Sequence, residues 1–191
     1  MRLLMILRLR AIGRQTANVY FRKKCIGFPW VIAMKHSTWK TYAFWIILTE
    51  AVGALAGLLT REGTKLYADS IIKPPLSPPA LVFPIAWTIL YALMGVSAAR
   101  VYQTPASAAR TRGLGLYLAQ LAFNFFWSII FFNLQAFGFA FLWLVVLWAL
   151  ILMMAFTFRR VDRPAALLQI PYLAWVLFAG YLNFGVWLLN R

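Results

Sequence analysis

The sequence is poor in the side chains that carry most enzymatic acid–base chemistry and metal binding. Its 191 residues include four acidic side chains, one histidine and one cysteine. The single cysteine, Cys25, excludes an intrachain disulfide. His36 and Cys25 both precede the long apolar stretches. We therefore expect no haem axial pair, no metal site and no paired carboxylates for catalysis inside the apolar part of the chain.

Charged residues are scarce too, and most of the other residues are apolar. Charged residues make up 12% of the chain, whereas hydrophobic residues make up 63%, and the mean hydropathy is +0.76. A transmembrane helix needs about 20 mainly apolar residues. Five stretches qualify, and Glu50 is the only charged residue within them. They are residues 41–60, 80–99, 113–132, 136–158 and 164–190. The composition predicts an integral membrane protein in a lipid bilayer.

The third and fourth of these spans form one uncharged run from residue 113 to residue 158, which is far longer than a single span needs. A turn at Asn133-Leu134-Gln135, followed by Gly138, is the natural place to divide it. Strands of a membrane barrel alternate in short segments, whereas these runs are continuously apolar. We predict an all-α bundle of five transmembrane helices over residues 41–191, with no separate soluble domain.

Lysine and arginine are distributed unevenly between the two sides of such a bundle. The N-terminal side holds fifteen of them, and the opposite side holds four. Because positively charged loops stay in the cytoplasm, we expect a multi-pass protein of the bacterial cell membrane with a cytoplasmic N-terminus. The net charge of +15 is then a topology signal. We expect no nucleic-acid partner.

Residues 1–40 form a basic N-terminal extension with three possible interpretations. The segment is rich in arginine and lacks acidic residues, which is typical of organelle-targeting peptides. It could also form a basic amphipathic helix on an anionic membrane surface. In the third interpretation, which we favour, the extension precedes a start at Met34, because "MKHSTWKTYAFW" already supplies a short basic lead into the first span.

The connection between the first two spans is rich in proline. In "KPPLSPPALVFPIAWTILY" the prolines at 74, 75, 78 and 79 supply no backbone donors and favour an extended chain. We expect a stiff segment that delivers the second helix at a fixed place. Ser77 and Pro78 suit the start of that helix, and Pro84 lies one turn inside it.

Three of the predicted helices carry aromatic and polar side chains at helical spacing. Polar amides inside a bilayer are costly unless they face a partner or a cavity. We predict that these stripes face one another around a cavity for a flat, mostly apolar ligand. The alternative is that the amides only join helix to helix and that the tryptophans lie in interfacial belts. The stripes are Pro84, Trp87, Tyr91 and Gly95; Tyr117, Gln120, Asn124, Trp127, Ser128 and Phe131; and Tyr172, Trp175, Ala179 and Asn183.

From about Met34 onward, these motifs together resemble the TspO/MBR family, the tryptophan-rich sensory proteins and the translocator protein. Its marks, in chain order, are Lys73-Pro74 with Pro78-Pro79, "VFPIAWTILY", "YLAQLAFNFFWSIIFF" and "PYLAWVLFAGYLNFGVW". The resemblance implies a five-helix bundle, commonly a homodimer, that binds protoporphyrin IX and related tetrapyrroles. For some bacterial members it also implies light-dependent porphyrin breakdown by two tryptophans, which match Trp87 and Trp175.

Two positions depart from the family pattern. Many relatives have a tryptophan between the paired prolines, where this chain has Leu76. The vertebrate sterol motif requires a tyrosine and a basic residue at the positions that correspond here to Phe184 and Leu188. We therefore do not expect sterol binding through that motif, which is a weak pattern in any case.

The main hypothesis is a tetrapyrrole receptor or sensor that needs no cofactor of its own. The alternatives are a light-dependent porphyrin-degrading enzyme, in which Trp87 and Trp175 would be catalytic, and a porphyrin or sterol transporter. The uncharged spans disfavour ion-coupled transport. The expected ligand-binding residues are Trp87, Tyr91, Gln120, Asn124, Trp127, Tyr172, Trp175, Ala179 and Asn183.

The charge distribution makes a prediction about topology. With five spans and a cytoplasmic N-terminus, a reporter fused after Arg191 should lie outside the cytoplasm. Paired alkaline phosphatase and green fluorescent protein fusions at Arg191 measure this. The phosphatase fusion should be active and the fluorescent fusion dark, and the reverse pattern would refute the orientation or the number of spans.

Overall fold

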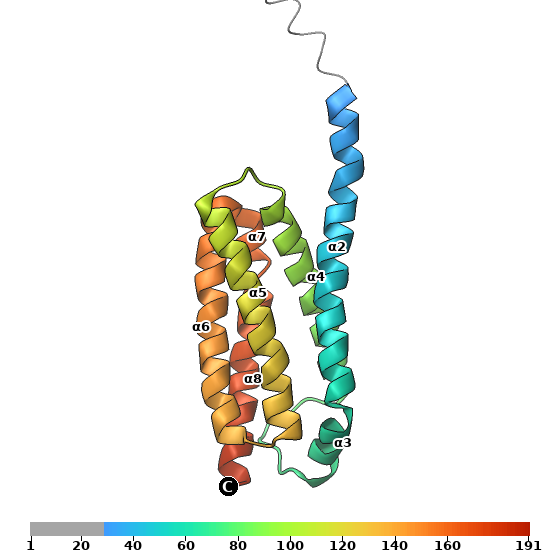
Figure 1. Cartoon of the computed structure of the whole chain (residues 1–191). Coiled ribbons are helices and arrows are strands. Elements are labelled where there is room, and N and C mark those ends of the chain that lie inside the picture. Colours follow the sequence, from blue (N-terminus) through green and yellow to red (C-terminus); the bar gives the residue numbers. More distant parts are fainter. Residues whose placement is uncertain (1–28) are drawn as a thin grey trace, which may run out of the picture. The chain divides into compact units, whose positions relative to one another are not determined.

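Five helices long and apolar enough to cross a membrane are present among the residues that the computed structural model describes, which confirms the predicted all-α bundle. The described part comprises the backbone of residues 29–191 and the side chains of residues 38–191. The spanning elements are α2 (Pro29–Leu59), α4 (Val82–Tyr102), α5 (Ala108–Ser128) with its extension η1 (Ile129–Asn133), α6 (Phe137–Val161), and α8 (Ile170–Leu189) with the short α7 (Arg163–Leu167) before it. Figure 1 shows α4, α5, α6 and α8 as neighbouring rods of one bundle.

The expectations for residues 1–28, including Cys25, lie outside the described residues. The same holds for the side chains of Met34 and His36. Residues 41–191 form one compact unit.

The predicted turn between the third and fourth spans is present. Helix α5 ends in the π-helical turn η1, and α6 begins at Phe137. Between them Gln135 has a positive φ of 50°, and the amide of Ala136 donates to the carbonyl of Ile130 at 3.3 Å. The backbone therefore reverses within three residues.

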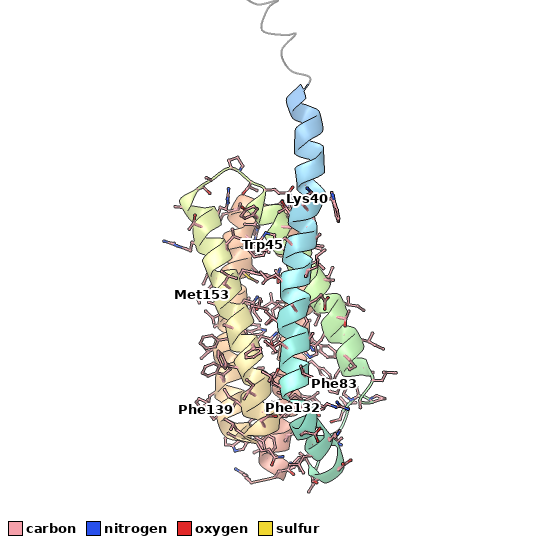
Figure 2. All side chains as sticks on the ribbon, turned by 45° about the vertical axis from the view of Figure 1, so that its right-hand side comes forward. Lys40, Trp45, Phe83, Phe132, Phe139 and Met153 are labelled. Carbon is pink, nitrogen blue, oxygen red and sulfur yellow. The ribbon has the colours of Figure 1, made fainter. Side chains whose placement is uncertain are left out.

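A short helix that we did not predict, α3 (Arg61–Ser70), lies in the connection between the first two spans. Its Tyr67 ring packs against Phe131 and Phe132 of η1, with ring centroids 5.4 and 5.5 Å away. Gly63 lies so close to η1 that a Cβ atom there would be 2.5 Å from the carbonyl oxygen of Phe132. Figure 2 shows Phe83 and Phe132 at this end of the bundle, which we call the α3 end.

The proline-rich segment after α3 forms no helix, but a turn at residues 75–76 interrupts the expected extended conformation. The expected helix start at Ser77-Pro78 is wrong. Helix α4 begins at Val82, four residues later than Pro78. The Ser77 hydroxyl donates to the carbonyl of Pro74 at 2.8 Å, so it closes a turn in the segment instead of capping the helix. Leu76 occupies that turn with a positive φ of 66°.

The opposite end of the bundle is held by an ion pair. Arg100, near the end of α4, donates to both carboxylate oxygens of Asp162, with N–O distances of 2.7 and 3.2 Å. Asp162 immediately precedes α7. The Ser97 hydroxyl adds a bond of 2.8 Å to the carbonyl of Ala165. A two-point Arg–carboxylate pair is a directional contact, so the end of α4 is fixed to the start of α7.

Helices α2 and α4 approach each other closely at Gly95. A Cβ atom at Gly95 would lie 2.6 Å from the Cα atom of Ile46 and 2.9 Å from the carbonyl oxygen of Trp45. Both neighbours are backbone atoms, which cannot turn aside as a side chain can. A glycine at position 95 is thus required for this helix contact.

We predict that Gly95→Ala lowers the thermal stability of the protein. The added methyl group must push α2 away from α4, at a cost of about 1–3 kcal/mol for overpacking. Gly57→Ala is the matched control, because a Cβ atom there has no neighbour within 4 Å. Thermal unfolding in detergent, followed by circular dichroism, should show a lower midpoint for Gly95→Ala alone. Equal midpoints for the two variants would contradict the close contact.

Candidate functional site

Helix α5 presents the side chains of Tyr117, Gln120, Asn124 and Trp127 at intervals of three or four residues, which places them on one face. All four are buried. Each forms a hydrogen bond with a side chain from another membrane helix. The partners are Thr49 of α2 for Tyr117, Tyr172 of α8 for Gln120, Tyr91 of α4 for Asn124, and Asn183 of α8 for Trp127.

The middle two of these bonds lie beside a group of aromatic rings. Tyr172 donates to Oε1 of Gln120 at 2.9 Å, and Nδ2 of Asn124 donates to the hydroxyl of Tyr91 at 3.1 Å. Trp87 stacks on Tyr91, with centroids 5.2 Å apart and planes inclined by 30°. The Asn124 bond therefore connects the polar face of α5 to the aromatic face of α4, and the Gln120 bond connects it to α8.

Trp87 also meets the aromatic face of α8. Its ring centroid lies 6.2 Å from that of Tyr172 and 6.5 Å from that of Trp175, edge to face in both cases. Phe83, one turn earlier in α4, contacts Trp175 at 6.1 Å. The structure thus brings six of the nine predicted residues together. We call these six the ring cluster: Trp87, Tyr91, Gln120, Asn124, Tyr172 and Trp175.

The other three predicted residues lie outside the ring cluster. Nε1 of Trp127 donates to Oδ1 of Asn183 at 3.2 Å, and Nδ2 of Asn183 donates to the carbonyl of Phe137 at 2.8 Å. Trp127 also stacks on Phe131 at 5.2 Å. Ala179 is buried on α8 between the two groups. The Trp127–Asn183 pair therefore fits the alternative interpretation of a helix-to-helix contact.

Two buried amide atoms of the ring cluster have no hydrogen-bond partner. They are Nε2 of Gln120, a donor, and Oδ1 of Asn124, an acceptor, and they lie on successive turns of α5. A buried polar atom without a partner costs about 1–3 kcal/mol. Such atoms in native proteins need an explanation, and a bound water or ligand is the usual one. The cluster can therefore offer a ligand one donor and one acceptor next to its aromatic rings.

An apolar groove of about 400 Å³ lies between α4 and α8. It is lined by Ala86, Ile89, Leu90, Pro171, Ala174, Trp175 and Phe178. Trp175 belongs both to this groove and to the ring cluster, and both Trp175 and Trp87 are only half-buried. The Trp175 indole therefore forms the wall between the surface of the bundle and its interior rings.

Two residues that contact the predicted site residues, Thr49 and Phe83, were not predicted from the sequence. Thr49 is fully buried in α2, where its hydroxyl contacts Tyr117 and also bonds the carbonyl of Trp45. Its signal was present in the helical spacing of Trp45, Thr49 and Ala56, which are the buried residues among the described side chains of α2. Phe83 gave no such signal, since its contact with Trp175 depends on where α4 begins.

Comparisons with known proteins agree with this architecture. A family model described as the TspO/MBR family matches residues 45–188. The chain is 38% identical over 151 residues to the tryptophan-rich protein TspO of Chlorobaculum tepidum, covering 78% of this chain and 96% of the relative. It is 36% identical over 151 residues to the tryptophan-rich sensory protein of Cereibacter sphaeroides, covering 78% and 92%. It is 34% identical over 166 residues to the translocator protein of Bos taurus, covering 85% and 92%. Because these matches extend across nearly the full length of the relatives and the family model reaches from α2 to α8, the chain belongs to the TspO/MBR family.

Proposed function

We propose that this membrane protein is a receptor or sensor that binds a tetrapyrrole, with protoporphyrin IX as the model ligand, at the ring cluster. One observation carries the proposal: two indoles and two phenols from α4 and α8 meet beside a buried donor and a buried acceptor of α5 that have no partner. The names of the relatives, tryptophan-rich sensory protein and translocator protein, support the broader assignment.

The chemistry of the ring cluster suits a flat macrocycle. Indole and phenol faces stack on extended π systems, and the surrounding helices supply apolar side chains. Gln120 can donate to a ligand oxygen or nitrogen, and Asn124 can accept from a ligand N–H group. The rings now pack against one another, so a macrocycle must displace Trp87 or Trp175. The groove beside Trp175 provides space for that displacement.

Light-driven oxidation of the bound porphyrin, with dissolved molecular oxygen as the oxidant, is the second candidate function. The observation that favours it is the edge-to-face pair of Trp87 and Trp175, with centroids 6.5 Å apart. Indoles are readily oxidised, and both would contact a macrocycle bound between them. In this reading Trp87 and Trp175 are the catalytic residues, whereas in the receptor reading they only bind.

We propose further that the chain forms a homodimer through α5. Two sets of small residues are candidates for close helix contact: Gly53 and Gly57 of α2, and Gly115, Ala119 and Ala122 of α5. Gly53 of α2 is already used inside the bundle, because a Cβ atom there would collide with the ring of Tyr91. Gly115 and Ala122 of α5 lie on the exposed surface instead. A second copy can approach that surface closely, as small residues permit in membranes.

The binding prediction concerns protoporphyrin IX and the two tryptophans. Trp87→Ala and Trp175→Ala should each weaken binding several-fold to tenfold. Lost stacking is worth about 0.5–1.5 kcal/mol beyond area burial, and about 1.4 kcal/mol corresponds to a factor of ten. Titration of the porphyrin Soret band in detergent or nanodiscs measures the affinity in darkness.

Trp39→Ala is the control for these variants. The Trp39 side chain is 65% exposed, so its removal should leave the affinity unchanged. Trp87→Phe and Trp175→Phe then separate the two candidate functions under illumination, since phenylalanine keeps an aromatic ring but not an oxidisable indole. A wild-type protein that gives no saturable Soret change would end the proposal.

A further inference from the structure

Three exposed arginines lie within five residues at the point where α6 ends and α7 begins. They are Arg159 and Arg160, in the last turn of α6, and Arg163, the first residue of α7. We call residues 159–163 the arginine corner. Among residues 38–191, whose side chains the structure describes, no group forms a hydrogen bond or an ion pair with these three guanidinium groups. Their positive charges therefore have no partner within this part of the chain.

The single acidic residue of the arginine corner is engaged with another helix. Asp162 lies between Arg160 and Arg163 in the sequence, but both of its carboxylate oxygens accept from Arg100 of α4, at 2.7 and 3.2 Å. The side chain of Asp162 is only 15% exposed. Because the two-point pair of Arg100 and Asp162 is neutral as a unit, it does not balance the charge of the three outer arginines.

The rest of the chain offers no other acidic residue at this end of the bundle. The sequence has four acidic residues in all, and none precedes Glu50, which lies within the span formed by α2. Glu62 and Asp69 belong to α3 at the opposite end, where Glu62 pairs with Lys65 at 3.0 Å. An anion that balances the arginine corner must consequently come from outside the chain.

Exposed apolar side chains continue from two of these arginines toward the interior of the membrane. Phe156 and Met153 lie four and seven residues before Arg160, so the three residues share a face of α6. Leu167 lies four residues after Arg163, at the other end of α7. The three apolar side chains are between 49% and 61% exposed. A molecule bound at the arginine corner therefore meets positive charge and, directly beside it, an apolar surface.

We propose that the arginine corner binds the phosphate group of an anionic phospholipid. Arg160 and Arg163 are three residues apart, so their guanidinium groups can reach one phosphate, whose oxygens match the planar fork of each arginine. Basic residues next to a membrane span attract anionic headgroups. The apolar side chains beside the arginines accommodate the acyl chains, which a free phosphate ion lacks. This site lies apart from the ring cluster and does not depend on the proposed function.

The test measures the dissociation constants of dioleoyl phosphatidylglycerol and dioleoyl phosphatidylcholine by native mass spectrometry of the full chain in detergent. The double variant Arg160→Gln/Arg163→Gln should bind phosphatidylglycerol about tenfold more weakly or worse, because each lost basic residue removes an attraction to the anionic headgroup. Its affinity for phosphatidylcholine should not change. The double variant Arg61→Gln/Arg191→Gln is the matched control, since it loses the same charge from two exposed positions at the α3 end, and it should match the wild type.

Three results would overturn the site: equal affinity of the wild type for the two lipids, unchanged affinity in Arg160→Gln/Arg163→Gln, or equal weakening in both double variants, which is a general effect of net charge. Excess inorganic phosphate at constant ionic strength should not displace phosphatidylglycerol, and displacement would refute a lipid as the ligand. Circular dichroism checks the fold of each variant. If the double variant does not fold, the single variants Arg160→Gln and Arg163→Gln are compared with Arg61→Gln in its place.

Discussion

The fold depends on the hydrogen-bonding face of α5. Apolar contacts between helices in a bilayer have little preference for one rotation over another, because lipid tails are as apolar as leucine. A buried amide or hydroxyl does have such a preference, since it needs a partner at a defined place. Tyr117, Gln120, Asn124 and Trp127 bond to α2, α4 and α8, and the backbone of α5 at Phe123 accepts from Trp143 of α6. One helix thereby sets the rotation of its four spanning neighbours.

On this face of α5, some buried polar atoms have hydrogen-bond partners and others have none. Trp127 and both ends of the Asn183 amide have partners, and this pair connects α5, α8 and the start of α6. Gln120 and Asn124 each use one amide atom for a tyrosine and leave the other without a partner. Structural amides are expected to be fully paired, because each missing bond is costly inside a bilayer. On this face of α5, Gln120 and Asn124 are the incompletely paired residues, and we propose that the ligand binds there. Gln135 and Gln169, which lie off this face, also have buried amide atoms without a partner.

The two ends of the bundle are held by different chemistry. At one end the charge-assisted pair of Arg100 and Asp162 joins α4 to α7. At the α3 end the proline-rich segment, residues 71–79, is held by neutral hydrogen bonds to Asn190 and Tyr181 and by the fit of Pro74 over Gly185. Neutral bonds contribute less than charge-assisted ones.

The sequence by itself determined the five spans, the turn at residues 133–135 and the three aromatic and polar stripes. These features follow from composition and from periodicity along one helix, which are local properties. It did not determine α3, whose apolar contacts are supplied by η1. It did not determine the start of α4 either, because the Ser77 hydroxyl bonds to Pro74 within the proline-rich segment.

Only the tertiary structure decided which polar side chains are partners. Gln120 and Asn183 both lie on the polar stripe of their helix and are both fully buried. Nε2 of Gln120 nevertheless has no hydrogen-bond partner, whereas both amide atoms of Asn183 have one. The bond between Asn190 and Ile72 joins residues 118 positions apart. Spacing along a helix tells which side chains share a face, but partners on different helices are chosen by how the helices pack, and packing depends on every contact of the bundle at once.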